Sequence, residues 1–531
     1  MSLRNLTDDF LKQEASLRLG GGAAGVERQK RLNRLTVRER LKELLDDPED
    51  FFELGLWAGY KMYPEYGELP AAGVITGIGK VSKRSCMIIA NDATVKAGAF
   101  FPQSVKKVLR AQRIAFECRL PVLYLVDSSG VFLPLQAEIF PDEDDFGRIF
   151  RNNAIFSAAG IPQIAAIMGN CIAGGGYLPV LCDKLLMTEG SGLYLAGPAL
   201  VKAAIGQVVD TEELGGAKMH AEVSGTVDFL EPDDISCLHR MRALVDMLPP
   251  DPVQSTDELH LPAENSAKIY DLVSSDNTKM YDVHQLIDCI VDSGSFEEYK
   301  AHFGKTLVTG YAKIGGKRIG VVANQRCSTK TGKGAVEIGG VLYADSADKA
   351  SRFIMDCNQI KTPIIFLQDV VGFMVGREAE QAGIIRSGAK LVNAMSNSIV
   401  PKITIIVGNS FGAGHYALCG KAYDPHFILA WPNAKYAVMG ADQAADTLFS
   451  VQEQAAERKG QPLIPEEAQR MHSALKDKYT EQTDIRYGAA RGWVDAIIAP
   501  DQTRNLLIKL LKHIERSPMN NRTFHTGVIQ V

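Results

Sequence analysis

Short apolar runs bounded by glycine, proline or asparagine recur along the chain, and segments of helical periodicity lie between them. The runs LPVLYLVDSSG (120–130) and IPQIAAIMGN (161–170) are typical of buried strands. The intervening segment SVKKVLRAQRIAFEC (104–118) instead places its apolar residues on one helical face. This alternation predicts an α/β fold with largely buried sheets.

The strand-like runs occur twice, in the same order and at a nearly constant offset. TGIGKVSKRSCMIIAND (76–92) matches TGYAKIGGKRIGVVANQ (309–325), the run 120–130 matches TPIIFLQDVVG (362–372), and the run 161–170 matches VPKITIIVGN (400–409). We interpret this as duplication of a domain of roughly 240 residues. The proline-rich and polar stretch 247–265 is the predicted joint, which gives domains at 1–262 and 263–531.

Composition narrows the class of protein. A chain of 531 residues with 46% hydrophobic and 23% charged residues is expected to fold and to exceed a single core. A net charge of −5 gives no reason to expect a nucleic-acid or membrane partner. Nine scattered cysteines without a CxxC pair, and histidines without an HExxH motif, predict no metal site. The acidic N-terminus resembles neither a signal nor a transit peptide, so we expect a cytoplasmic protein.

Glycine clusters stand at equivalent places in the two halves, after a strand and before a helix. The candidate residues are Ala173, Gly174 and Gly175 in the first half, and Gly412, Ala413 and Gly414 in the second. The N–H groups of a helix N-terminus can point at a developing negative charge, which is the chemistry of an oxyanion hole. Tight turns or close strand–helix packing are the alternative. Recurrence in matching positions favours function.

Other candidate chemistry is weaker. Gly77–Ser82 lacks the last glycine of a dinucleotide fingerprint, and Thr331–Gly334 lacks the upstream glycine and the Ser/Thr of a P-loop. His415 is the one histidine in a candidate loop, and a direct role for it stays open. A basic cluster would suit phosphate groups, with a solvated helix face as the alternative. Its members are Lys96, Lys106, Lys107, Arg110 and Arg113.

Longer motifs resemble a known family. The run DSSGVFLPLQAEIFPDEDDFGRIFRNNAIFSAAGIPQIAAIMGNCIAGGGYLP (127–179) closely resembles the carboxyltransferase, or beta, subunit of 3-methylcrotonyl-CoA carboxylase. The runs 195–225, 372–392 and 408–440 are similar to the same family. The resemblance implies tandem crotonase-like (ClpP/crotonase) domains. It also implies transfer of CO2 from carboxybiotin to an acyl-CoA through enolates held in two backbone oxyanion holes.

The resemblance assigns roles to residues and implies partners. Ala173, Gly174 and Gly175 would serve the CoA thioester, and Gly412, Ala413 and Gly414 would serve biotin. The cofactor-binding candidates are Lys96, Lys106, Lys107, Arg110, Phe411 and Gly372. Biotin would be carried by a separate alpha subunit with biotin carboxylase and biotin carrier domains. The beta subunits would form a homo-oligomer, expected to be a hexamer, and a monomer would be inactive.

Two features leave the reaction open. Residues 324–348, together with Gln368 and Asp369, look more like the carboxyltransferase subunit of glutaconyl-CoA decarboxylase. The acyl chain and the direction of CO2 transfer are therefore undecided at this point. A crotonase-type hydratase or isomerase is a further alternative, and it would need carboxylates such as Asp127, Glu138 and Asp369 as acid and base. A noncatalytic scaffold is the last alternative.

Overall fold

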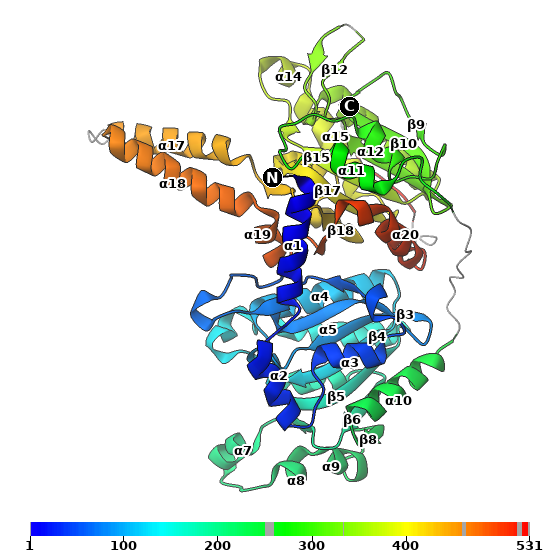
Figure 1. Ribbon diagram of the computed structural model, residues 1–531, viewed down its shortest axis with the longest axis vertical. Coiled ribbons are helices and arrows are strands. Elements are labelled where there is room, and N and C mark those ends of the chain that lie inside the picture. The colour runs from blue at the N-terminus through cyan, green and yellow to red at the C-terminus, as the bar shows by residue number, and fades with distance from the viewer. Residues whose placement is uncertain (1, 250–259, 333, 459–463, 518–522, 529–531) are drawn as a thin grey trace. The chain divides into compact units, whose positions relative to one another are not determined.

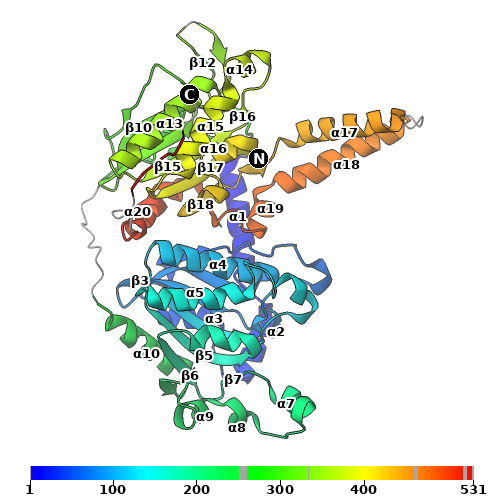
Figure 2. The same ribbon diagram turned by 180° about the vertical axis from the view of Figure 1, so that it is seen from behind.

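The computed structural model describes residues 2–249, 260–332, 334–458, 464–517 and 523–528 (Figures 1 and 2). The chain divides into two compact units. We call residues 12–254 with 490–492 the first unit, and residues 1–11, 255–489 and 493–531 the second unit. The predicted joint at 247–265 includes residues 250–259, which lie outside the described residues.

The first unit is built on an eight-stranded sheet of order β1-β2-β3-β4-β5-β6-β8, with β7 paired to the end of β5. The β2–β3 hairpin is antiparallel, and β3, β4, β5, β6 and β8 are parallel. The strands are β1 (Phe52–Leu54), β2 (Val74–Val81), β3 (Arg84–Asn91), β4 (Val122–Ser128), β5 (Gln163–Ile172), β6 (Lys184–Thr188), β7 (Gly192–Tyr194) and β8 (Phe229–Glu231).

Helices cover both faces of this sheet, so its strands are apolar on both sides. Leu123 and Leu125 of β4 pack in one core with residues of α3 and α10. Tyr124, between them, points to the opposite face, where its hydroxyl contacts Gln112 of α4 and Asn153 of α5. Figure 2 shows α4 and α5 side by side along that face. The helices are α2 (Gly22–Arg31), α3 (Val37–Leu44), α4 (Pro102–Glu117), α5 (Phe146–Ala158), α6 (Tyr177–Val180), α7 (Pro198–Ile205), α8 (Thr211–Gly215), α9 (Ala217–Glu222) and α10 (Asp234–Asp246), and α1 (Leu3–Leu17) precedes them.

The second unit repeats this plan with the sheet order β20-β18-β17-β15-β11-β10-β9, and β19 pairs with the end of β17. Helices α13 and α15 pack on one face in a shared apolar core. The strands are β9 (Glu297–Glu298), β10 (Leu307–Ile314), β11 (Lys317–Asn324), β15 (Ile364–Val370), β17 (Lys402–Phe411), β18 (Phe427–Ala430), β19 (Lys435–Ala437) and β20 (Ala496–Ile497).

Short strands and helices complete the second unit, including the antiparallel helices α17 and α18, which lie side by side (Figure 1). The pairs are β12 (Thr329–Lys330) with β13 (Val336–Glu337), and β14 (Val341–Leu342) with β16 (Gly372–Phe373). The helices are α11 (Ile269–Leu272), α12 (Val283–Asp288), α13 (Ala344–Gln359), α14 (Arg377–Gln381), α15 (Ile384–Ser396), α16 (Gly412–Ala417), α17 (Ala441–Arg458), α18 (Pro465–Thr483), α19 (Ile485–Ala490) and α20 (Thr503–Ile514). Within the described residues, no helix is long and apolar enough to cross a membrane.

The three sequence matches fall on equivalent elements, which confirms the duplicated α/β fold. Hairpin β2–β3 corresponds to β10–β11, β4 to β15, and β5 to β17. A buried lysine marks the repeat more finely. Lys107 of α4 donates to the carbonyl of Ala71 at 3.0 Å, and Lys349 of α13 donates to that of Leu307 at 2.9 Å. Each lysine ties its helix to the chain near the start of the hairpin beneath it.

Candidate active site

The two glycine loops lie where β5 and β17 end, each of which is the middle one of the parallel strands of its sheet. Strand β5 runs directly into a single 3₁₀ turn, η6 (Ala173–Gly176), and then into α6, whereas β17 runs directly into α16. Their first N–H groups are the ones that a helical turn leaves without an internal acceptor. All six candidate loop residues are therefore at strand–helix junctions, as the sequence predicts.

Backbone geometry and packing also require some of these glycines. Gly412 has φ +56°, a left-handed conformation that residues with a side chain rarely adopt. A Cβ on Gly414 would lie 2.5 Å from a methyl group of Val370. In contrast, a Cβ on Gly175 would meet the ring of Phe146 at an ordinary 3.8 Å. Close packing therefore accounts for glycine in the second loop but not at Gly175.

Just before each loop, the sheet carries the same irregularity. Val126 and Ser128 of β4 pair with Ile167 and Cys171 of β5, so Asp127 alone faces residues 168–170. In the second unit, Gln368 and Val370 pair with Ile406 and Ser410, so Asp369 alone faces residues 407–409. Such bulges interrupt the ladder of hydrogen bonds and redirect the strand. In both units, side chains make hydrogen bonds to the backbone groups of the bulge that the ladder leaves unpaired.

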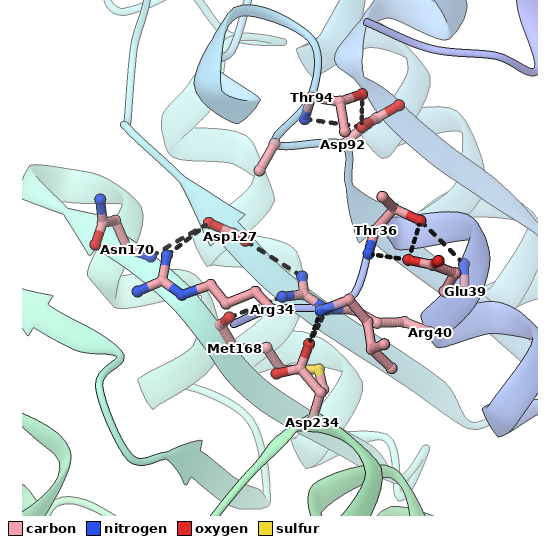
Figure 3. Close-up of polar contacts among 12 residues, drawn as sticks. Arg34, Thr36, Glu39, Arg40, Asp92, Thr94, Asp127, Met168, Asn170 and Asp234 are labelled. Carbon is pink, nitrogen blue, oxygen red and sulfur yellow. Dashed lines mark hydrogen bonds and ion pairs between the residues drawn. The ribbon is translucent and has the colours of Figure 1, made fainter. Parts of the chain in front are cut away.

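In the first unit, Asp127 and Arg40 bond this bulge (Figure 3). The Asn170 N–H donates to Asp127 Oδ1 at 3.3 Å, and Arg40 Nη2 donates to the Met168 carbonyl at 2.8 Å. Arg40 also pairs with Asp127 at 3.3 Å and with Asp234 at 2.8 Å. With 1% exposure for Arg40 and 4% for Asp127, this ion pair is inside the protein.

In the second unit, different residues make equivalent contacts. The Asn409 N–H donates to Asp369 Oδ1 at 2.8 Å, and Asn433 Nδ2 donates to the Val407 carbonyl at 3.1 Å. Arg326 lies 3.3 Å from the Asp369 carboxylate, which also accepts from the Tyr281 hydroxyl at 3.2 Å. Burial raises the pKa of Asp369, against the opposing effects of Arg326, the Asn409 N–H and the Tyr281 hydroxyl.

Both aspartates lie against a glycine. A Cβ on Gly169 would fall 2.0 Å from Asp127 Oδ1, and a Cβ on Gly408 would fall 2.4 Å from the Asp369 carboxylate. The Gly-Asn pairs that end two of the repeated sequence blocks are therefore explained. Glycine makes room for the carboxylate, and the N–H of the next residue donates to it.

His415 is part of a buried chain of hydrogen bonds rather than an exposed base. Ser410 Oγ donates to Gln368 Oε1 at 2.6 Å, because the Gln368 amide nitrogen is bonded to a backbone carbonyl. The His415 Nδ1–H therefore donates to Ser410 Oγ, 2.7 Å away, and its Nε2 accepts from the Tyr436 hydroxyl at 2.6 Å and the Lys421 N–H at 3.3 Å. Burial lowers the pKa of His415 to about 4, so the ring is neutral at physiological pH.

A cavity of about 430 Å³ adjoins the second loop, within the second unit. Its lining includes Ala437 and Val438 of the β19 segment, and the Val438 carbonyl lies 3.0 Å from the Cβ position of Gly412. Aliphatic and aromatic side chains of β19, α17 and α18 form most of the remaining wall, which also includes Trp493. Such a cavity suits an uncharged, flat or branched group.

The basic cluster does not form one surface. Lys106 and Arg110 lie one turn apart on α4, and Lys96 is exposed on a neighbouring turn, η4 (Lys96–Gly98). Lys107 is instead 6% exposed, and burial lowers its pKa to about 7. Because Lys349 is buried in the same way in the second unit, we assign Lys107 to the fold and leave it out of any CoA contact.

The two remaining candidates lie close to the second loop. Phe411 is the last residue of β17 and is 8% exposed. The Cα of Gly372 in β16 lies 3.5 Å from the Cβ position of Gly414. Sequence reasoning missed Arg40, Arg326 and Asn433. Among the described residues, no group of three or more His, Cys, Asp and Glu side chains could hold a metal ion.

Two α/β units that each end a central parallel strand in a glycine loop define a tandem crotonase-like fold of the carboxyltransferase type. The chain matches the Carboxyl transferase domain family over residues 28–527. It is 43% identical to the biotin-dependent 3-methylcrotonyl-coenzyme A carboxylase beta1 subunit of Mycobacterium tuberculosis, over 97% of this chain and 95% of that protein. The chain therefore belongs to the carboxyl transferase family and is a biotin-dependent acyl-CoA carboxyltransferase.

Two further relatives bear on the reaction. The crystal structure of the beta subunit of P. aeruginosa geranyl-CoA carboxylase matches with a TM-score of 0.86 at 34% identity, covering 100% of this chain and 96% of that one. The methylmalonyl-CoA decarboxylase subunit alpha of Propionigenium modestum is 32% identical, over 96% of this chain and 95% of that protein. The family thus includes proteins named for carboxylation and for decarboxylation.

Proposed function

We propose that this chain transfers CO2 from carboxybiotin to 3-methylcrotonyl-CoA or a related branched enoyl-CoA. The observation that carries the proposal is the pair of equivalent glycine loops, each at the end of the central strand of its unit. The similarity to the 3-methylcrotonyl-CoA carboxylase beta1 subunit supports the choice of acyl group.

The first loop, residues 173–175, is proposed to bind the thioester oxygen of the acyl-CoA. Removing a proton from the acyl group places negative charge on that oxygen, and N–H groups already aimed at it stabilise the charge without reorganising. Lys106 and Arg110 are the proposed contacts for CoA phosphates, because they share one face of α4 at the surface of the same unit. Lys96 is a further candidate.

The second loop, residues 412–414, is proposed to hold biotin, with Phe411 and Gly372 beside it. Biotin supplies the carboxyl group that is transferred. Its ring system is uncharged, and the apolar cavity of about 430 Å³ beside Gly412 suits such a group. The N–H groups of the loop would donate to the ureido oxygen, and the apolar wall would exclude water.

The same site can serve the reverse direction. The similarity to methylmalonyl-CoA decarboxylase subunit alpha favours a decarboxylase as the second candidate. Gln368 and Asp369, which prompted the comparison with glutaconyl-CoA decarboxylase, are both buried and bonded within the second unit. A hydratase or isomerase gains no support, since Asp127 and Asp369 bond arginines and backbone, and Glu138 is exposed on η5 (Leu133–Glu138).

The chain would act in an assembly. We propose a homo-oligomeric, hexameric beta core that works with a biotin-bearing alpha subunit, and a cytoplasmic location. In this proposal residues 1–262 act on the acyl-CoA and residues 263–531 on biotin. A stable, active species of about 58 kDa in light scattering would contradict the oligomer, because one chain would then suffice.

Substrate assays test the reaction itself. The protein is incubated with 3-methylcrotonyl-, geranyl-, glutaconyl- and propionyl-CoA, in both directions, with free biotin or a biotin carrier. We expect the 3-methylcrotonyl substrate to give the highest kcat/KM for carboxylation. Faster decarboxylation of a carboxylated acyl-CoA would instead establish the second candidate. Turnover of an enoyl-CoA without any biotin would overturn both.

Proline substitutions test the division between the loops. Gly175→Pro deletes a loop N–H, whereas Gly175→Ala keeps it and fits the space, so only the proline variant should lose acyl-CoA carboxylation. Losing one oxyanion donor typically costs about 10²–10³ in rate. Ala413→Pro should slow decarboxylation of carboxybiotin measured without acyl-CoA, with Ala413→Gly as its control. If both proline variants damage both measurements equally, the assignment of one substrate to each loop is wrong.

A further inference from the structure

We propose that Asp127 and Asp369 are positioning residues, each of which sets the direction of the glycine loop that follows in its own unit. They act on the backbone of the bulge and need not touch a substrate. The inference rests on the proposed function for what the loops bind. The inference goes beyond the proposed function because it names the side chains that orient the loops.

The bulge is close enough to each loop to control it. Asn170, whose N–H donates to Asp127, stands three residues before Ala173. At Asn170, β5 exchanges partners, because Ile164–Ile167 pair with β6 whereas Asn170–Ile172 pair with β7. Asn409 stands three residues before Gly412, and β17 makes the same exchange from β18 to β19. The N–H that donates to each aspartate therefore belongs to the first residue that pairs with the new strand.

Ion pairs hold both carboxylates in place. Arg40 contacts Asp127 and the Met168 carbonyl, and Asp234 holds Arg40 in turn. Arg40 thus bonds one end of the bulge and Asp127 the other, as Figure 3 shows. An aspartate held in this way accepts from a backbone N–H through a charged, and therefore stronger, hydrogen bond.

The recurrence of the arrangement argues that the carboxylate is its essential part. Arg40 comes from α3, ahead of the hairpin, whereas Arg326 follows β11. The carbonyl at the other end of the bulge is bonded by Arg40 in one unit and by Asn433 in the other. The supporting side chains therefore differ between the units. The aspartate, the glycine beside it and the asparagine N–H that donates to it are the same.

The experiment compares Ala and Asn at both positions in the assembled full-length protein. Asp127→Asn keeps an acceptor for the Asn170 N–H and leaves Arg40 paired with Asp234, so the variant should fold even if Asp127→Ala does not. Glu53→Ala is the control in the first unit, where the Glu53 side chain, 4% exposed, pairs with the partly exposed Arg38 at 2.8 Å. Asp292→Ala is the control in the second unit. It accepts from the N–H groups of Gly315 and Gly316 and pairs with an arginine, away from the loops.

Two measurements are made on each variant. Hydrogen exchange reports the loop peptides covering 168–178 and 407–417. Kinetics report kcat and KM for acyl-CoA carboxylation and, separately, carboxybiotin decarboxylation without acyl-CoA. We expect Asp127→Ala to speed exchange in the first loop alone and to lower kcat about 10- to 100-fold, with little change in KM, because misplacement of the donors by about 1 Å has this effect. Asn should recover part of the loss, and the controls should leave loop exchange unchanged.

Corresponding changes at Asp369 should appear in the second loop and in carboxybiotin decarboxylation. Wild-type loop exchange, or wild-type kcat, in the folded Asn and Ala variants would overturn the positioning role. Faster loop exchange with a loss of kcat supports it. If each variant then slows both half-reactions equally, the positioning role stands and the proposed division of substrates between the loops fails.

Discussion

Replacing the buried His415 should remove a pH dependence from the stability of the second unit. The ordinary histidine pKa of 6.5 is lowered to about 4 in the folded protein by burial. Between these two pH values the unfolded chain binds a proton that the folded chain does not. The contribution of this histidine to stability is therefore complete above about pH 6.5 and is lost as the pH falls towards 4.

The pKa shift sets the size of the effect. One pKa unit corresponds to about 1.4 kcal/mol, so lowering the pH from about 8 to about 4.5 should cost about 2.5 kcal/mol through His415 alone. For a unit of this size that is a fall of about 5–10 °C in Tm. His415→Asn should lack this fall, although it loses hydrogen bonds to Ser410 and Tyr436 and starts less stable by about 1–3 kcal/mol at neutral pH.

The assay is thermal unfolding of both proteins at a fixed scan rate, in small pH steps from about 8 to about 4.5. The wild type should begin with the higher Tm, and the difference should shrink or reverse at the acidic end. Thr404→Val is the control, because it removes a buried hydrogen bond of β17 at 2.7 Å without removing a titratable group. A constant difference between wild type and His415→Asn over the whole range would show that His415 is not held neutral, and the hydrogen-bond chain assigned to it would be wrong.

Three further outcomes follow from the geometry of single residues. Lys106→Glu should raise the KM for acyl-CoA more than that for free biotin, whereas Lys107→Met should lower Tm and change neither KM; equal effects of Lys106→Glu on both KM values would point to a role in folding. Gly408→Ala should lower stability by about 1–3 kcal/mol in thermal unfolding, because its Cβ would overlap the Asp369 carboxylate; an unchanged Tm would mean that the carboxylate can move aside freely. Trp493→Ala should raise the KM for free biotin but not for acyl-CoA, and the reverse pattern would assign the cavity to the acyl chain.

The fold could be predicted from the sequence because the apolar runs that form its strands occur twice in the same order. Blocks 76–92, 120–130 and 161–170 became adjacent strands, and their counterparts became adjacent strands of the second sheet. Glycine clusters after strands also placed both loops correctly. These features depend on local pattern and spacing, which a single sequence displays directly.

The side chains that hold the bulge before each loop were harder to predict from the sequence, for a physical reason. The repeat aligns Asp127 with Asp369, but a carboxylate read from the sequence alone suggests an acid or a base for a hydratase or isomerase. Nothing in the sequence shows that it accepts a hydrogen bond from a backbone N–H group. Arg40 and Arg326 reach the two aspartates from non-equivalent parts of the chain, so no spacing connects them. The burial of Lys107 could not be predicted from the sequence either. Its helix has a basic pattern, and only the packed structure shows that this lysine faces inward.

Arg40 and Arg326 come from non-equivalent parts of the two halves, so the halves are not interchangeable. If the Gly-Asn segment of one half replaced that of the other, its glycine and asparagine would still meet an aspartate at the new position. The carbonyl of the exchanged bulge would, however, meet Asn433 in place of Arg40, or the reverse. The two halves thus share the glycine, the asparagine and the aspartate, but they bond the carbonyl of the bulge with different side chains. A substitution at Arg40 or at Asn433 should therefore loosen the bulge of its own half and leave the other bulge intact.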